Sequence, residues 1–116
     1  MFALNFISEH NEQLLLSRKK TATIRPGDLR EFYPENSIVW VTFGKRYGTK
    51  KRLYKAVIDR VLIKRYADLT SAELSHQNPE ITTVDELIQT FEEIYEKQIH
   101  IDDMVTVIHF SEIVDQ

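Results

Sequence analysis

The chain has 116 residues, 42% of them hydrophobic and 28% charged, which predicts one globular domain over residues 1–116 and excludes a disordered chain. It contains no cysteine, which excludes disulfides and thiolate metal sites and favours a reducing, cytoplasmic location. Its net charge of -3 conceals a net charge of +8 in residues 1–65 and of −11 in residues 66–116. This asymmetry indicates either a basic face for an anionic partner or two segments that neutralise each other.

The apolar segments of the sequence are short. The run at residues 37–41 is far below the roughly 20 residues that a membrane-spanning helix needs. The N-terminal apolar residues are not preceded by basic ones, so a signal peptide is not expected. The sequence therefore predicts no membrane partner.

A helix and then a strand are predicted first. Ser8 is suited to begin a helix that continues through residues 14–16 and ends near Arg18. From Thr21 onward, β-branched residues predict a strand, which ends at the Pro-Gly-Asp turn of residues 26–28.

A long hairpin is predicted after a loop at residues 29–36. Residues 37–43 are rich in β-branched and aromatic side chains and are expected to form a buried strand, with Trp40 in the core. The polar segment 44–51 then leads into a second strand at residues 53–63.

Two helices and a closing strand are predicted for the remainder. Thr70 and Thr83 are each followed three residues later by Glu, which is the spacing of a capping box. The second helix carries an apolar stripe that is expected to pack on the sheet as core: Leu87, Phe91, Ile94 and Tyr95. Residues 104–110 are the expected closing strand. This order predicts an α+β fold with a small, strongly curved sheet or barrel and helices at its rim.

One motif carries a family resemblance. The sequence Lys-Thr-Ala-Thr-Ile-Arg at residues 20–25, followed by Gly-Asp at residues 27–28, resembles the Lys-Thr-x-Thr-x-Arg strand and the Gly-Asp pair of ASCH (activating signal cointegrator homology) domains. The similarity continues through residues 76–80 and 86–95. It implies a PUA-like fold, a curved mixed β-sheet or small β-barrel with flanking helices. The family usually has Gly at the position of Arg18, where a non-Gly residue in a left-handed helix end costs about 1 kcal/mol.

The resemblance also implies a chemistry. The chain is similar to the small bacterial 4-acetylcytidine amidohydrolases, whose general base, nucleophile and acid match Lys20, Thr23 and Glu80. A Thr hydroxyl needs a base to take its proton, and Lys serves when burial or nearby cations lower its pKa. Strand alternation places Thr21, Thr23 and Arg25 on one face, where Thr21 and Arg25 are expected to contact the substrate. Lys20 must then lie in the turn before the strand or reach round with its long side chain.

An RNA-binding module is the second candidate, because ASCH and PUA-like folds imply RNA binding. The hairpin carries six cations that could follow a phosphate backbone: Lys45, Arg46, Lys50, Lys51, Arg52 and Lys55. Tyr47, Tyr54 and Trp40 are close enough in sequence to offer stacking faces. Lysines at a hairpin also occur in proteins that bind no RNA, since they protect strand edges from aggregation.

A metal-independent ribonuclease is the third candidate, with Lys20, Arg25 and Glu80 binding phosphate and transferring protons. The four histidines have no metal-ligand spacing: His10, His76, His100 and His109. We therefore expect no metal and no cofactor, and a nucleoside or RNA as the partner. The sequence does not indicate an oligomeric state.

Overall fold

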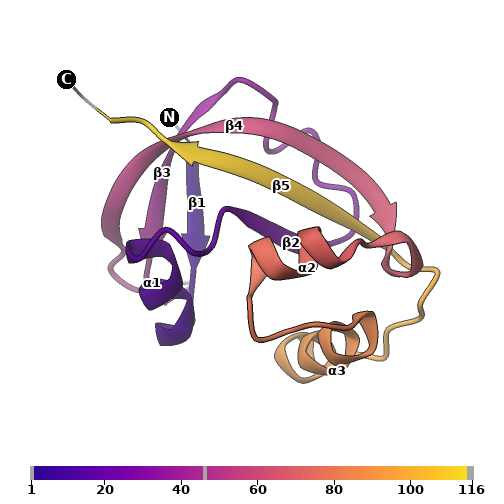
Figure 1. Ribbon diagram of the computed structural model, residues 1–116. Coiled ribbons are helices and arrows are strands. Elements are labelled where there is room, and N and C mark those ends of the chain that lie inside the picture. Colours follow the sequence, from indigo (N-terminus) through magenta and orange to yellow (C-terminus); the bar gives the residue numbers. More distant parts are fainter. Residues whose placement is uncertain (1, 46, 115–116) are drawn as a thin grey trace.

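The computed structural model describes residues 2–45 and 47–114 (Figure 1). Its strands are β1 (Phe2–Phe6), β2 (Ala22–Pro26), β3 (Ile38–Phe43), β4 (Lys51–Arg65) and β5 (Met104–Glu112). Its helices are α1 (Glu9–Leu16), the short 3-10 helix η1 (Tyr66–Asp68), α2 (Ser71–Gln77) and α3 (Val84–Tyr95). None of the helices in these described residues is long and apolar enough to cross a membrane.

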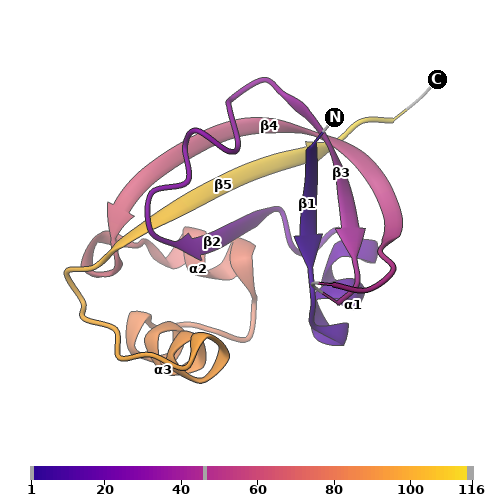
Figure 2. The same ribbon diagram turned by 180° about the vertical axis from the view of Figure 1, so that it is seen from behind.

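The strands form one mixed sheet in the order β1-β3-β4-β5-β2. β1 runs parallel to β3, and the other neighbours are antiparallel. The long strands β4 and β5 curve strongly, so the sheet curls into a half-barrel; α1 lies near β1 and β3, while α2 and α3 lie on the side of β2 (Figure 1, Figure 2). The predicted α+β fold with a curved sheet and flanking helices is confirmed.

Two hydrophobic clusters stabilise this arrangement. The first fills the curl of the sheet and includes Leu4, Val41, Ala56 and Phe110. The second lies between the sheet and the helices α2 and α3, and it includes Ile24, Leu74, Leu87 and Val107. Strand β5 contributes alternate side chains to each cluster and is buried on both faces, which explains its nearly continuous apolar sequence.

The expectation that Trp40 belongs to the core is wrong. Val39 and Val41 are the fully buried residues of β3, so alternation places Trp40 between them on the outer face of the sheet. There the guanidinium of Arg52 lies 4.7 Å from the centre of the Trp40 ring, and the Lys55 ammonium lies 5.3 Å from it. When a strand has apolar residues on both faces, its sequence does not show which face packs against the core.

Only two of the four residues in the predicted apolar stripe of α3 are buried in the core. Leu87 and Phe91 are buried, as predicted, whereas Ile94 and Tyr95 are 53% and 46% exposed. The helix therefore packs its first turns on the core and leaves the side chains of its last turn at the surface, where they border a cleft.

Thr70 and Thr83 begin helices, as the capping-box spacing predicts. Thr70 forms the full box, because its amide donates to the Glu73 carboxylate over 2.8 Å and its hydroxyl accepts from the Glu73 amide over 3.2 Å. Thr83 accepts from the Glu86 amide, but the Glu86 carboxylate accepts from the hydroxyls of Thr82 and Thr83 instead of a backbone amide. The second box is therefore incomplete.

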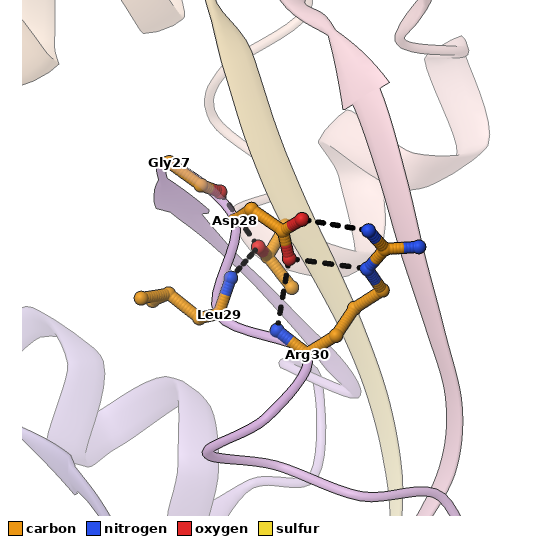
Figure 3. A network of polar contacts seen from close by, with 5 residues as sticks. Gly27, Asp28, Leu29 and Arg30 are labelled. Atoms are coloured by element: carbon orange, nitrogen blue, oxygen red, sulfur yellow. Dashed lines mark hydrogen bonds and ion pairs between the residues drawn. The ribbon is translucent and has the colours of Figure 1, made fainter.

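The Gly-Asp turn after β2 is fixed by Thr106 of β5. Gly27 has φ +85°, a left-handed conformation in which other residues are strained. The Thr106 hydroxyl donates to the Gly27 carbonyl over 2.7 Å and accepts from the Leu29 amide over 2.8 Å. Asp28 accepts two hydrogen bonds from the guanidinium of Arg30 (Figure 3). These contacts fix the end of β2, the strand that carries the family motif.

Candidate active site

A cleft lies where the two edges of the curled sheet approach each other. β1 and β2 are the edge strands, and Arg25 on β2 donates to the Asn5 carbonyl on β1 over 2.8 Å. The cleft measures about 470 Å³, within the size range of small-molecule sites. We name it the seam cleft, and it is lined by Asn5, Phe6, Ile7, Ser8, Asn11, Lys20, Thr23, Ile24, Arg25, Gln77, Phe91, Ile94 and Tyr95.

The end of α1 delivers Lys20 to this cleft. Arg18 has φ +63°, and the amides of Arg18 and Lys19 donate back to the carbonyls of Leu15 and Leu14. This is the left-handed helix end that a Gly would form. The Arg18 side chain donates two hydrogen bonds, of 3.0 and 2.6 Å, to the Glu112 carboxylate. The turn therefore keeps its shape without Gly.

Lys20 is a buried amine with carbonyl partners. Its side chain is 1% exposed, and Nζ donates to the backbone carbonyl and to the side-chain Oε1 of Gln77, each over 2.7 Å. None of the ion pairs among the described residues involves Lys20. Burial, together with the nearby Arg25 cation, lowers the pKa of Lys20 well below its ordinary value. The side chain is thus suited to accept a proton.

Thr23 and Arg25 line the same cleft, together with Ile24 between them. Thr23 is 4% exposed. The Arg25 guanidinium donates to the Tyr33 hydroxyl over 3.1 Å and lies 5.3 Å from the centre of the Phe6 ring. These contacts hold the Arg25 cation in the cleft that Thr23 and Lys20 also line.

Two residues of the predicted site are not among those that line the seam cleft. Thr21 precedes β2, is exposed, and borders a smaller cleft with Arg18 and Tyr54. Glu80 lies in the loop between α2 and α3; its side chain is 73% exposed, and its Oε2 lies 3.1 Å from Nε2 of His10. The structure therefore brings together Lys20, Thr23 and Arg25, and it places Glu80 beside α1.

Of the residues that line the seam cleft, Lys20, Thr23 and Arg25 were predicted as site residues; those that were not include Gln77, Asn5 and Tyr95. Gln77 holds Lys20, and the backbone of Asn5 holds Arg25. Tyr95 borders the cleft at the end of α3. Tyr95 continues the four-residue spacing of Leu87 and Phe91, and that spacing predicted a core residue and not a cleft residue. Gln77 lies in the segment 76–80 that shares the family similarity, but only Glu80 of that segment was assigned a role, and no pattern marks Asn5.

The predicted RNA-binding cations lie at the turn between β3 and β4 or along β4: Lys45, Lys50, Lys51, Arg52 and Lys55, while Arg46 lies outside the described residues. Lys51 lies 3.5 Å from the carboxylate of Glu12. Of the aromatic side chains suggested for stacking, Tyr47 is 92% exposed and Trp40 is partly exposed. Tyr54 is 8% exposed, belongs to the first core cluster and has the Arg18 guanidinium 4.1 Å from its ring centre, so that suggestion was wrong.

The histidines are dispersed over the described part of the chain. His76 and His109 contact each other with ring centres 6.4 Å apart, and His10 contacts Glu80. Among the residues that the structure describes, no group of three His, Asp or Glu side chains is placed to hold a metal ion.

No family model and no curated protein matches the sequence. Similar solved structures include an ASCH domain from Lactobacillus crispatus JV V101, with a TM-score of 0.68 and 12% identity over 95% of this chain and 77% of that one. The hypothetical protein PH0355 has a TM-score of 0.68 and 14% identity over 97% of this chain and 98% of that one. Protein EF3133 from Enterococcus faecalis V583, of family DUF984, has a TM-score of 0.64 and 18% identity over 87% of this chain and 65% of that one.

These likenesses define the fold. The chain has the fold of an ASCH domain, a PUA-like curled sheet with flanking helices, as the motif at residues 20–25 implied. It spans less than two thirds of the length of the Enterococcus protein, 65%. At identities of 12% to 18% the likeness concerns the fold, and function has to be argued from the site.

Proposed function

We propose that this protein is an amidohydrolase that converts 4-acetylcytidine to cytidine and acetate in the seam cleft. The observation that supports this most is the buried amine of Lys20, whose pKa is lowered and which lines one cleft together with Thr23. An unprotonated amine is the base that a Thr nucleophile needs. The resemblance to the small bacterial amidohydrolases supplies the choice of substrate.

In the proposed reaction, Thr23 Oγ1 bonds to the acetyl carbonyl carbon while its proton moves to Nζ of Lys20. The resulting oxyanion lies next to the Arg25 guanidinium, which stabilises the developing charge. The C–N bond then breaks, the Lys20 ammonium returns its proton to the cytosine nitrogen, and cytidine leaves. Water, deprotonated by Lys20, attacks the acetyl ester on Thr23 and releases acetate, and the proton on Lys20 returns to Thr23.

The remaining groups of the cleft suit a pyrimidine nucleoside. Tyr95 is 46% exposed and stands edge-on to Phe91, with ring centres 5.5 Å apart, so its outer face is available to a flat base. Glu80 is the acid that the resemblance implies, and it is the alternative to Lys20 as donor of the proton to the leaving nitrogen. To act there, its side chain has to turn away from His10 toward the cleft.

The test is a turnover assay with pure protein. Acetylcytidine is offered beside a panel of other acylated nucleosides, and release of cytidine is followed by chromatography for the wild type and for Thr23→Ala. We expect turnover that depends on Thr23. If the pure protein hydrolyses no acylated nucleoside, the proposed function is wrong.

Single-stranded RNA binding on the outer face of β3 and β4 is a second candidate, favoured by the surroundings of Trp40. The register shift between Val41 and Thr42 breaks the alternation of β4. Arg52 and Tyr54 are two residues apart, so in a regular strand their side chains would share a face. Because of the shift, Tyr54 is buried while Arg52 lies over the Trp40 ring. An aromatic ring flanked by Arg52 and Lys55 offers both a stacking face and phosphate contacts.

We expect two kinds of substitution to affect RNA affinity differently. Arg52→Gln with Lys55→Gln should reduce the slope of log affinity against log salt by about 0.7 for each cation removed. Trp40→Ala should weaken binding by about 1–3 kcal/mol at every salt concentration and leave the slope unchanged. Fluorescence anisotropy with a labelled single-stranded RNA measures both. Affinity that is absent, or indifferent to salt, would exclude this candidate, and Thr23→Ala serves as the control that should leave binding unchanged.

A further inference from the structure

One glutamine connects the proposed base to the strand that carries the proposed nucleophile. Gln77 is the last residue of α2. Its Oε1 accepts from Lys20 Nζ over 2.7 Å and from the backbone amide of Ile24 over 2.8 Å. Its backbone carbonyl accepts a second hydrogen bond from Lys20 Nζ, also over 2.7 Å. Ile24 directly follows Thr23, so Gln77 fixes the amine relative to the backbone next to the hydroxyl.

We propose that Gln77 is a positioning residue, which directs the lone pair of Lys20 into the seam cleft. This inference rests on the proposed function, in which Lys20 is the base. A neutral amine has two N–H bonds and one lone pair in a tetrahedral arrangement. The backbone carbonyl and Oε1 of Gln77 accept a hydrogen bond from each of the two N–H groups. The lone pair therefore points away from Gln77, toward the cleft that Thr23 also borders.

The charge of the oxygen atoms that accept hydrogen bonds from Lys20 affects its protonation, in addition to their location. Amide and backbone carbonyl oxygens accept hydrogen bonds but carry no net charge, so they hold the amine with less stabilisation of the ammonium form than a carboxylate gives. Five other charged or titratable side chains border the two clefts that Lys20 touches: Arg25 and Tyr95 in the seam cleft, and Arg18, Tyr54 and Glu112 in the smaller one. Arg18 and Glu112 pair with each other at 2.6 Å. The one carboxylate of this set is thus already neutralised.

Gln77→Glu adds a negative charge beside Lys20 and keeps a side chain of the same length, so it tests the effect of charge alone. The new carboxylate keeps an acceptor for Ile24 and for Lys20, so the fold is expected to persist. A carboxylate in contact with an ammonium raises the pKa of Lys20 by about 1–3 units. The base must lose its proton to act, so kcat/KM at a pH below both the original and the new pKa should fall by about 10-fold to about 1,000-fold. Activity should recover as the pH is raised, which a merely structural defect would not produce.

The experiment measures the pH profile of kcat/KM for acetylcytidine and, separately, the rate at which acetic anhydride labels Lys20 as a function of pH, read by mass spectrometry. Gln89→Glu makes the same chemical change at an exposed position of α3 and is the matched control. We expect both profiles to move to higher pH in Gln77→Glu and to remain in place in Gln89→Glu. A labelling profile that does not move in Gln77→Glu would overturn the inference.

The two readouts also distinguish this inference from the proposed function. If labelling shifts but neither protein hydrolyses acetylcytidine, then Gln77 controls Lys20 and the proposed substrate is wrong. If hydrolysis by Gln77→Glu falls equally at every pH without a shift in labelling, Gln77 has only a structural role. Gln77→Ala provides a second check, because it removes Oε1 and leaves the backbone carbonyl. It should lower kcat more than it changes KM.

Discussion

Lys20→Met is expected to reduce hydrolysis of acetylcytidine by about 10²–10⁴-fold, the usual contribution of a positioned general base. Methionine fills a similar space, so the cleft should keep its shape while the proton acceptor is lost. The neighbouring Lys19 is exposed, and Lys19→Met is the matched control that should retain activity. The kcat/KM values of the three proteins measure the effect. Equal activity in Lys20→Met and the wild type would remove Lys20 from the mechanism.

The same variant should change how stability depends on pH. The pKa of Lys20 is lowered in the folded protein, mainly by burial. Between that lowered pKa and the ordinary value of 10.5, the unfolded chain therefore binds more protons at this site than the folded one. The free energy of unfolding of the wild type should consequently rise with pH in this window. Lys20→Met lacks this pH-dependent contribution, so its stability relative to the wild type should be greatest below the lowered pKa of Lys20 and decline as the pH rises toward about 10.

Urea denaturation at a series of pH values measures this difference. Lys19→Met again serves as the control and should follow the wild type throughout, because Lys19 is exposed. A difference between Lys20→Met and the wild type that stays constant with pH would mean that Lys20 keeps an ordinary pKa in the folded state.

Phe91→Ala is expected to lower the free energy of unfolding by about 3–5 kcal/mol, the usual cost of removing a buried aromatic ring. Phe91 is 4% exposed, and its ring stands edge-on to Tyr66 and Tyr95, with centres 6.3 and 5.5 Å apart. It joins α3 to the second core cluster and also borders the seam cleft. Its loss should therefore loosen the helix that forms one wall of the cleft.

The matched control lies on the same helix. Ile94 is 53% exposed, so Ile94→Ala should cost less than about 1 kcal/mol. Thermal and urea denaturation of both variants compare the two positions. If Phe91→Ala were as mild as Ile94→Ala, α3 would not be anchored through Phe91.

The local elements could be predicted because short-range chemistry determines them. β-branched residues followed by the Pro-Gly-Asp sequence gave β2, and Thr70 with Glu73 gave the start of α2. The alternation of side chains along β2 left two possibilities for Lys20, the turn before the strand or a side chain that reaches round it, and the structure places Lys20 before the strand. These inferences depend on residues within a few positions of each other.

The cleft itself depends on contacts that no local pattern specifies. Arg25 meets the backbone of Asn5 because the curled sheet brings its two edges together, and Lys20 meets Gln77 across 57 positions of sequence. Thr21 shows how sensitive alternation is to a strand boundary, since β2 begins one residue after it. Trp40 shows that an apolar pattern identifies a strand without identifying its covered face.

The most direct test of the proposed reaction is to look for the acetyl group on Thr23 during turnover. Wild-type protein is mixed with acetylcytidine, quenched in acid within the turnover time, digested, and examined by mass spectrometry. The proposal predicts an acetyl ester on the peptide that contains Thr23, absent from Thr23→Ala and accumulated when deacylation is slowed. Cytidine release by Thr23→Ala at the wild-type rate, with no acetylated peptide in either protein, would contradict it.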